Sequence, residues 1–268
     1  YHLPGEGSNN QHDTSLGGSI NWLLNSDSNM NNYSGGKSFT DTGATFRKDY
    51  AMEPGTKGKL DFFIKPYEEG DLSLEFSLDI VPYVMDGDTP QVVDKTSTAS
   101  QFLSGHIVYF LGETQNDTVT YTWIKDGTFR ITIPKAEKDK EYNYSIYWVW
   151  PLNLSTILLN KQDEFLNEST IEFDDKDATG ELRNQIVTDM TIHPEKYFFS
   201  SLTGKPLDTN YEELNVIKDI LNNSTYDKQL FVDLSSYYNQ ADMKIGENIS
   251  FITATLEYLG KTEAKNED

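Results

Sequence analysis

The fold class is decided by the stretch Leu72-Ser73-Leu74-Glu75-Phe76-Ser77-Leu78-Asp79-Ile80. Its apolar residues alternate strictly with Ser, Glu and Asp, and this period of two is typical of a β-strand with one buried face. An upstream segment follows the same pattern at Leu60, Phe62 and Ile64 before Pro66 ends it. The sequence therefore predicts antiparallel sheet structure that packs its apolar face on a core.

Three more alternating segments lie downstream. They comprise Val119, Tyr121 and Trp123, then Phe129, Ile131 and Ile133, and finally Tyr142, Tyr144, Ile146, Trp148 and Trp150. Asp126-Gly127 separates the first two segments, and because this dipeptide favours a tight turn we expect a hairpin there. Tyr147 and Val149 make the second face of the last segment apolar, which predicts a strand covered on both sides near its end. Further strands are expected at residues 186–192, 230–234 and 249–258.

Helices are expected at two places. Residues 211–221 follow candidate caps at Thr209 and Asn210, and they carry apolar side chains on one helical face. Residues 156–166 carry a second apolar stripe at helical spacing. Many strands with one or two short inserted helices predict an all-β fold, and we expect an antiparallel β-sandwich.

The chain shows no internal repeat and no linker that divides it, so we expect one folded domain. Residues 1–45 are rich in Gly, Ser, Asn and Asp and are expected to form an N-terminal arm of loop with at most one short strand. The sandwich is expected to span residues 46–260, with a helical insertion around residues 155–222. Residues 261–268 are expected to form a frayed polar tail.

Composition excludes several classes of partner and chemistry. The chain has 268 residues, with 22 Lys and Arg against 43 Asp and Glu, and its formal net charge of −21 repels phosphate backbones and anionic lipid headgroups. Nucleic acid is therefore not an expected partner, and no apolar run reaches the roughly 18 to 20 residues of a membrane span. Without Cys there is no disulfide and no thiolate site. Because the chain begins at Tyr1, we interpret any export signal as removed or left out.

Catalytic motifs are missing from the sequence. The four histidines His2, His12, His106 and His193 are scattered, and no His-Glu-x-x-His pair is present to hold zinc. There is no Gly-x-Ser-x-Gly nucleophile elbow and no phosphate-binding Gly-rich loop. We interpret His106 as a residue that leads into a strand and His193 as part of a turn. The chain is therefore expected to be no enzyme and to carry no cofactor.

Two acidic segments are weak candidates for calcium, because hard cations bind several oxygen ligands. One contains Asp86 and Asp88, and the other contains Asp174, Asp175 and Asp177. Neither segment has the spacing of an EF-hand loop. In a chain with 43 acidic residues a solvated acidic surface is the simpler interpretation.

The aromatic residues allow two interpretations. Exposed Trp and Tyr side chains on a sheet could stack on sugar rings, which would suit a carbohydrate-binding module. Trp148 and Trp150, however, share the parity of Tyr144 and Ile146, and such a ladder is typical of a strand that faces the core. We therefore expect these tryptophans in the core.

The N-terminal arm contains an apolar island in a polar segment. Ile20, Trp22 and Leu24 lie at strand parity and form a candidate assembly arm. An open antiparallel sheet has edges whose unpaired backbone groups attract further strands, and strand addition can join separate chains. The arm is either donated to a neighbouring subunit or folded on its own subunit, and the sequence leaves both alternatives open.

Three blocks of sequence resemble a known family. They are Gly105 to Phe110 (GHIVYF), Trp123 to Phe129 (WIKDGTF) and Tyr144 to Pro151 (YSIYWVWP), preceded by Pro54-Gly55. Together they resemble secreted proteins of Gram-positive bacteria related to the TasA/camelysin group. The resemblance implies an exported jelly-roll sandwich that assembles into extracellular biofilm-matrix fibres by strand donation. Camelysin carries a metallopeptidase label, but no zinc motif is present here to receive that activity.

We therefore expect an extracellular structural subunit that self-associates into a matrix or surface fibre by donor-strand exchange. The alternative is a monomeric cell-surface module for carbohydrate binding or adhesion. Like-charged subunits must pack despite their repulsion, so assembly is expected to strengthen in acid or in salt.

Overall fold

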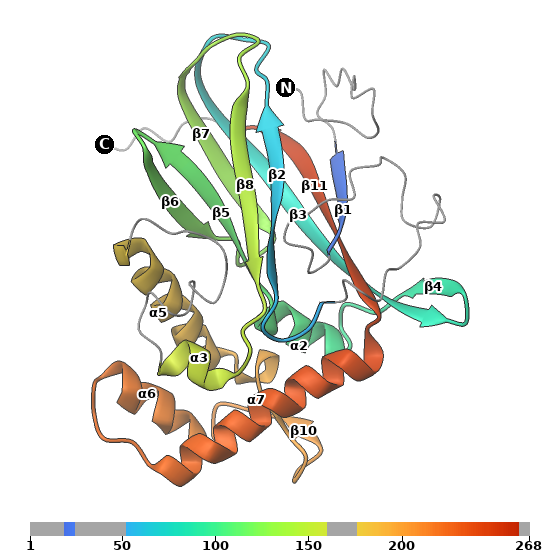
Figure 1. The fold of residues 1–268 in the computed structure, drawn as a ribbon, viewed down its shortest axis with the longest axis vertical. Helices are drawn as coiled ribbons and strands as arrows, with labels where there is room; N and C mark the ends of the chain where they lie inside the picture. The colour runs from blue at the N-terminus through green and yellow to red at the C-terminus, as the bar shows by residue number, and fades with distance from the viewer. Residues whose placement is uncertain (1–18, 25–51, 160–175, 263–268) are drawn as a thin grey trace.

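The computed structural model describes residues 19–24, 52–159 and 176–262, and the fold is mainly β, with antiparallel sheets packed together and several helices (Figure 1). The strands are β1 (Ser19–Leu23), β2 (Lys57–Ile64), β3 (Gly70–Asp86), β4 (Thr89–Val92), β5 (Val108–Gln115), β6 (Thr118–Trp123), β7 (Thr128–Ala136), β8 (Tyr142–Val149), β9 (Phe199–Ser200), β10 (Lys205–Pro206) and β11 (Phe251–Lys261). The helices are α2 (Thr98–His106), α3 (Leu154–Leu158), α5 (Lys176–Ile192), α6 (Asn215–Leu221) and α7 (Lys228–Asn248), with short 3-10 turns η2 (Pro194–Lys196) and η3 (Glu212–Leu214).

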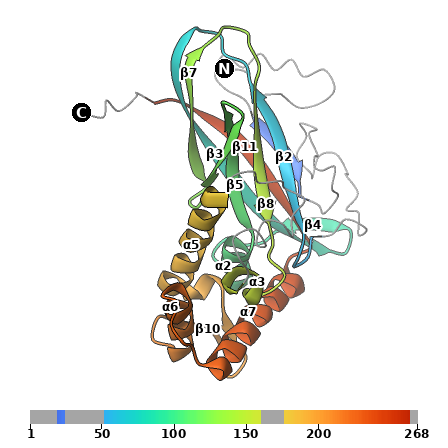
Figure 2. The same ribbon diagram turned by 60° about the vertical axis from the view of Figure 1, so that its left-hand side comes forward.

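Two sheets form the body of the molecule. The first has the strand order β1-β11-β3-β4, with β7 also paired to β3, and the second has the order β2-β8-β5-β6. Figure 2 shows the helices gathered around one end of these sheets. Apolar side chains from both sheets and from α2 make one continuous core between them. The expectation of a mainly β, antiparallel fold is confirmed.

The long strand β3 forms because its even positions are apolar. Leu72, Leu74, Phe76 and Leu78 are buried in the core, and Ile80 is partly buried beside them. The strand continues to Asp86, beyond the alternating stretch. The predicted core residues of β8 behave in the same way, since Ile146 and Trp148 are buried and Tyr144 is partly buried.

The second sheet is covered on both faces at one end, and a second core lies there. Tyr109 and Leu111 of β5 point to the core between the sheets, whereas Val108 and Phe110 pack with the helices. Val149 of β8 belongs to the helical core too, which confirms that this strand is covered on both sides near its end. Runs of consecutive apolar residues follow from this double burial.

Two predicted strands are wrong, because residues 186–192 lie in α5 and residues 230–234 lie in α7. Ile186 and Met190 are four residues apart and both fully buried, as a helix requires. The N-terminus of α7 is fixed by the Asp227 carboxylate, which accepts hydrogen bonds from the backbone N–H groups of Gln229 (2.8 Å) and Leu230 (3.0 Å). The helical segment thus extends to Asn248 rather than ending near residue 222.

The remaining helices differ from expectation in their bounds. Residues 211–221 form η3 and α6, and neither has the side-chain cap that Thr209 or Asn210 was expected to provide. The predicted helix at 156–166 begins two residues earlier as α3, capped by Asn153, and residues 160–166 lie outside the described ranges. Helix α2 was not predicted, although the Ser97 hydroxyl caps it by accepting from the Ser100 N–H at 3.2 Å.

The expected hairpin at Asp126-Gly127 is wrong. The strands on its two sides, β6 and β7, belong to different sheets and do not pair with each other. The connection crosses between the sheets, with the Ile124 N–H donating to the Tyr109 carbonyl (2.8 Å) and the Leu78 N–H donating to the Gly127 carbonyl (2.7 Å). Gly127 has a φ of 74°, which suits glycine, so the dipeptide signals a turn without specifying a hairpin.

Candidate assembly strand and its groove

Strand β1, which contains Ile20 and Trp22 of the candidate assembly arm and is followed directly by Leu24, lies at the edge of the first sheet beside β11 (Figure 1). The pairing is antiparallel, with Ile20 opposite Leu256 and Trp22 opposite Ala254. The Leu24 N–H continues the ladder by donating to the Ile252 carbonyl at 3.0 Å. Within the described ranges β11 is the strand partner of β1. We call the place along β11 that β1 occupies the groove.

Side chains of the assembly arm fill the open side of the core. Ile20, Trp22 and Leu24 are 3%, 1% and 4% exposed, and all three belong to the core between the sheets. The small side chain of Ala254 lies opposite the indole of Trp22, and Ala254 is itself fully buried. The strand parity expected for this island is therefore confirmed.

Burial of these side chains is the main source of affinity between β1 and its groove. Fully burying a large apolar side chain contributes roughly 1.5 to 3 kcal/mol, and the assembly arm buries three of them, two in β1 and Leu24 directly after it. A shift by one residue would turn all three toward solvent, so the register is strongly specified. Without β1 the groove would expose apolar core and the backbone edge of β11, a surface that attracts another strand.

The outer face of β1 is uncharged and comprises Ser19, Asn21 and Leu23. Asn21 lies opposite Thr255, whose hydroxyl donates to the Asn21 side-chain oxygen at 2.6 Å. The strand itself has the sequence SINWL, without any charged residue. On the facing segment of β11, Glu257 opposite Ser19 is the acidic residue of the register. Charge repulsion within the β1–β11 pairing itself is therefore small.

Long stretches of chain flank β1 on both sides. Sequence separates Leu24 from Met52 by 27 residues, and a fully extended chain of that length spans about 90 Å. Covalent geometry thus permits β1 to reach β11 of its own subunit or β11 of an adjacent one. Both alternatives for the arm require the same pairing that is seen here.

The calcium candidates do not form a cluster in the described part of the chain. Asp86, the last residue of β3, and Asp88, in the turn to β4, are both exposed, and Asp86 accepts a hydrogen bond from the Gln91 side chain at 3.3 Å. Asp174 and Asp175 lie outside the described ranges, as does the side chain of Asp177 in α5. Among described residues, no three His, Asp or Glu side chains converge as metal ligands.

Two of the four histidines, His106 and His193, lie in the described ranges. His106 is fully buried at the end of α2, directly before β5, and both of its ring nitrogens are hydrogen-bonded. His193 lies before η2, half-exposed, with Nδ1 at 3.2 Å from the Glu195 carboxylate. His2 and His12 lie outside the described ranges. Sequence reasoning missed the partners of His106 because they come from residues far away in the chain.

Tryptophans at the predicted core positions lie in the interior. Trp148 and Trp150 are 1% and 4% exposed. The Trp150 indole N–H donates to the Asp242 carboxylate at 2.8 Å, so its polar atom is satisfied. These two side chains therefore offer no exposed face on which a sugar ring could stack.

Comparisons with protein-family models, with curated proteins and with solved structures give no match for this chain. None of the helices in the described ranges combines the length and apolar character that a membrane crossing requires. Functional inference therefore rests on the residues and their geometry.

Proposed function

We propose that this protein is a secreted, extracellular structural subunit that polymerises into a matrix or surface fibre by donor-strand exchange. In this proposal the two sheets form a jelly-roll-like β-sandwich, and β1 of one subunit completes the first sheet of the next. The resemblance to the TasA/camelysin group supports the same fold and assembly.

The observation that carries the proposal is the isolation of β1. It is a short edge strand with two buried apolar side chains, Ile20 and Trp22, followed directly by the buried Leu24, and long polar stretches of sequence flank it. Its described strand pairing is with β11 alone, so an identical strand from a neighbour can make the same contacts. Exchange of an identical element between subunits is a low-cost route to assembly.

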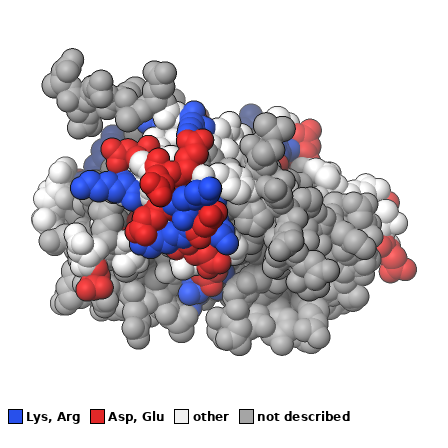
Figure 3. All heavy atoms as spheres, turned by 90° about the horizontal axis from the view of Figure 1, so that it is seen from above, with Lys and Arg blue, Asp and Glu red and all other residues white. Residues whose placement is uncertain are grey.

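Charge sets the conditions for assembly. The formal net charge of −21 makes subunits repel one another, and protonation or salt reduces that repulsion. Acidic and basic side chains are interspersed on the face shown in Figure 3. Ion pairs of the described residues include Lys140–Glu137 and Lys261–Glu68, each at 2.6 Å. We therefore expect fibres to form more readily at pH 5 or in moderate salt than at pH 7 in low salt.

The Asn21–Thr255 pair provides a direct test of exchange. In an antiparallel ladder, opposite residues that exchange backbone hydrogen bonds alternate with opposite residues that do not. The Leu24 N–H bonds to the carbonyl of its register partner Ile252, so Asn21 and Thr255, three positions along, exchange no backbone hydrogen bonds with each other. The Cβ atoms of such pairs are close enough for a disulfide. Because the chain contains no Cys, N21C and T255C introduce the only thiols.

The experiment mixes the N21C subunit with the T255C subunit under assembly conditions and oxidises the mixture. Exchange predicts a disulfide-linked heterodimer on a non-reducing gel and fibres in negative-stain micrographs. Each variant oxidised alone is the matched control, since it holds only one member of the pair. The proposal fails if the mixture gives no heterodimer while the N21C/T255C double variant closes its disulfide within single monomers.

The alternative, a monomeric carbohydrate-binding or adhesion module, has less support. Its expected stacking platform on β8 would need exposed tryptophans, and Trp148 and Trp150 are buried. A sharp, saturable hit on a glycan array, together with a monomer at millimolar concentration and pH 5, would favour this alternative over the fibre.

A further inference from the structure

One edge of β3 is interrupted, and this gap has no role in the proposed assembly. β7 pairs with β3 as far as Ser77, and β4 pairs with β3 from Tyr83 onward. Both lie on the edge opposite β11, because the Leu78 N–H bonds to Gly127 and the Pro82 carbonyl accepts from the Val93 N–H. On that edge no described strand pairs with the residues between them.

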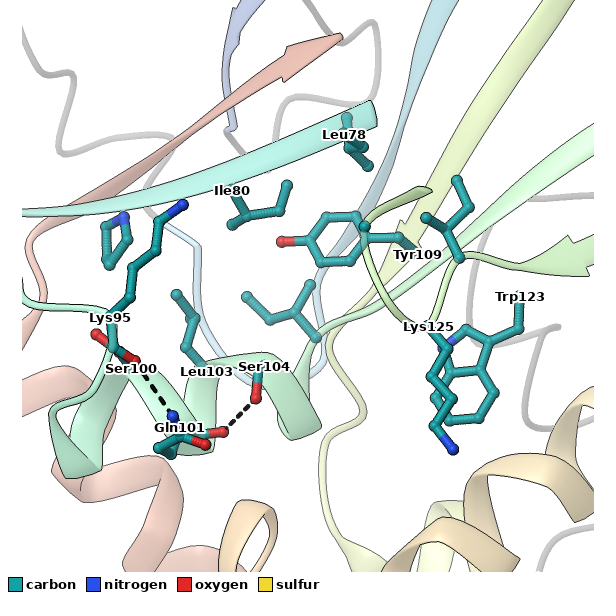
Figure 4. Close-up of a pocket in the computed structure, with 14 residues that line it drawn as sticks. Leu78, Ile80, Lys95, Ser100, Gln101, Leu103, Ser104, Tyr109, Trp123 and Lys125 are labelled. Atoms are coloured by element: carbon teal, nitrogen blue, oxygen red, sulfur yellow. Dashed lines mark hydrogen bonds between the residues drawn. The ribbon is translucent and has the colours of Figure 1, made fainter. Parts of the chain in front are cut away.

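A cavity of about 190 Å³ lies at this gap, between the two sheets and α2 (Figure 4). Its walls are largely aliphatic. They are formed by Leu78, Ile80, Pro82, Leu103, Ile107 and Ile124. An apolar cavity of roughly 150 Å³ is large enough to bind benzene, so this one can hold a body of about six to eight carbon atoms.

Tyr109 places one unpartnered polar atom in this cavity. Its side chain is 7% exposed, and its hydroxyl is buried with no hydrogen-bond partner among the described residues. Figure 4 shows the hydroxyl directed into the space between Ile80 and Lys95. Burial raises the pKa of the Tyr109 phenol, so the group stays protonated and is available as a donor.

Three other polar side chains of the lining, on α2, are already hydrogen-bonded. Ser100 donates to the Asp94 carbonyl (2.7 Å), Ser104 to the Gln101 carbonyl (2.6 Å), and the Gln101 amide to the Lys95 carbonyl (3.2 Å). An unsatisfied buried hydroxyl is costly unless a ligand or water completes it. The phenol of Tyr109 therefore stands out as the group that a ligand would engage.

The charge of the lining differs from that of the whole chain. Acidic residues outnumber basic residues 43 to 22 in the sequence, yet the lining contains Lys95 and Lys125 and no Asp or Glu. The acidic partners of these lysines, Asp79 and Asp189, lie outside the lining. The two lysine side chains are 58% and 41% exposed, so they mark the solvent side of the cavity. This arrangement favours an anionic group on the ligand.

A peptide strand fits the gap poorly. Gly127 and Val93 already bond to positions 78 and 82 of β3, which leaves three residues, or roughly 10 Å, of free edge. A typical strand has about five or six residues. The space therefore suits a small molecule.

We infer that this cavity is a binding site for a short monocarboxylic acid with an apolar body of about six to eight carbons. The body occupies the aliphatic walls, the carboxylate accepts a hydrogen bond from the Tyr109 hydroxyl, and Lys95 and Lys125 attract the negative charge. The inference is independent of fibre formation, because no residue of β1 lines the cavity.

Calorimetric titration of the full chain with sodium octanoate tests the inference, with octan-1-ol as the uncharged probe. We expect octanoate to bind saturably and octan-1-ol to bind about tenfold more weakly. Tyr109→Phe should weaken octanoate binding about tenfold or more, the effect of losing a hydrogen bond to a charged group. Lys95→Met should weaken octanoate binding and leave octan-1-ol binding unchanged.

Two measurements separate binding from folding. Tyr109→Phe should unfold at the same urea concentration as the parent or a higher one, because it removes a hydroxyl without a partner. Tyr226→Phe, which alters a tyrosine of the helical core outside the lining, is the matched control and should bind octanoate like the parent. The inference is overturned if octanoate shows no saturable binding up to 10 mM, or if the parent and Tyr109→Phe bind octanoate equally well. A crystal in which a second copy of the chain fills the cavity would also overturn it.

Discussion

The imidazole of His106 and the carboxylate of Asp242 lie 2.7 Å apart, Nδ1 to Oδ1, and this contact joins the end of α2 to α7. The other ring nitrogen of His106 lies 2.8 Å from the Tyr197 carbonyl oxygen, and the ring stacks on Tyr238 with centroids 4.0 Å apart. Both ring nitrogens thus lie within hydrogen-bond distance of an acceptor. His106 thereby links α2, which packs on the core between the sheets, to α7 and to Tyr197.

Loss of this contact is predicted to be costly. Asp242→Ala leaves the His106 imidazole and the Trp150 indole N–H without their shared acceptor. Leaving a buried hydrogen-bonding group unsatisfied costs about 1 to 3 kcal/mol, and because two groups lose their acceptor we expect a loss of at least that size in urea unfolding. Asn239→Ala, at an exposed position on the same helix, should change stability by less than ~0.5 kcal/mol. Equal effects of the two substitutions would contradict this role for Asp242.

Two helical glycines provide a matched pair for stability. A Cβ added at Gly105 in α2 would overlap the backbone carbonyl of Lys196, whereas nothing lies within 4 Å of a Cβ added at Gly246 in α7. Gly105→Ala should therefore destabilise by about 1 to 3 kcal/mol. Gly246→Ala should stabilise by about 1 kcal/mol, because alanine favours the helix. Thermal unfolding of both variants checks the opposite signs, and stabilisation by both would show that α2 packs less closely than described.

Glu113 on β5 gives the fold a pH dependence. Partial burial raises the pKa of its carboxyl above the ordinary value. Since the folded state holds the proton more tightly, this contribution to stability is present in acid and is lost as the pH rises through the raised pKa. Glu113→Gln removes that loss, so the variant should gain stability relative to the parent as the pH rises from about 4 to 7. Parallel pH profiles of the two proteins in urea unfolding would disprove it.

Trp22 and Leu23 are neighbours in β1 whose side chains lie on opposite faces of the strand. Trp22→Ala empties a site that is 1% exposed and should cost about 3 to 5 kcal/mol in the soluble subunit. Leu23→Ala alters the adjacent, partly exposed position and should cost much less. Trp22→Ala should also abolish fibres in micrographs under conditions where Leu23→Ala still assembles. Normal fibres from Trp22→Ala would rule out β1 as the donated strand.

Strands with one polar face were predictable, because burial on one side imposes a period of two. Residues 72–80 and 249–258 show this pattern, and both lie largely within the strands β3 and β11. Residues 230–234 also alternate, but Val232 is 58% exposed and Leu234 is buried, since they lie on different faces of α7. In so short a window the two periods overlap, and packing against the helical core decides between them.

Only the β1 half of the candidate assembly site was predictable from the sequence. The parity of Ile20, Trp22 and Leu24 identified the strand, whereas its wall in β11 lies more than two hundred residues away. The cavity was not predictable either. It depends on a connection that crosses between the sheets after Trp123, and the Asp126-Gly127 signal favoured a hairpin there instead. Such features depend on which distant segments meet, and local sequence patterns do not encode it.

The docking of β1 on its own sheet implies a concentration threshold for the proposed fibre. An exchanged strand makes the same pairing as a self-docked one, so exchange by itself gains no strand contacts. A strand tethered to its own groove has an effective concentration of the order of millimolar for a short flexible linker, and lower for a longer one. Dilute subunits therefore stay closed by their own strand. The proposed fibre should therefore grow where the subunit concentration approaches this effective concentration, for example on a surface that confines the subunits.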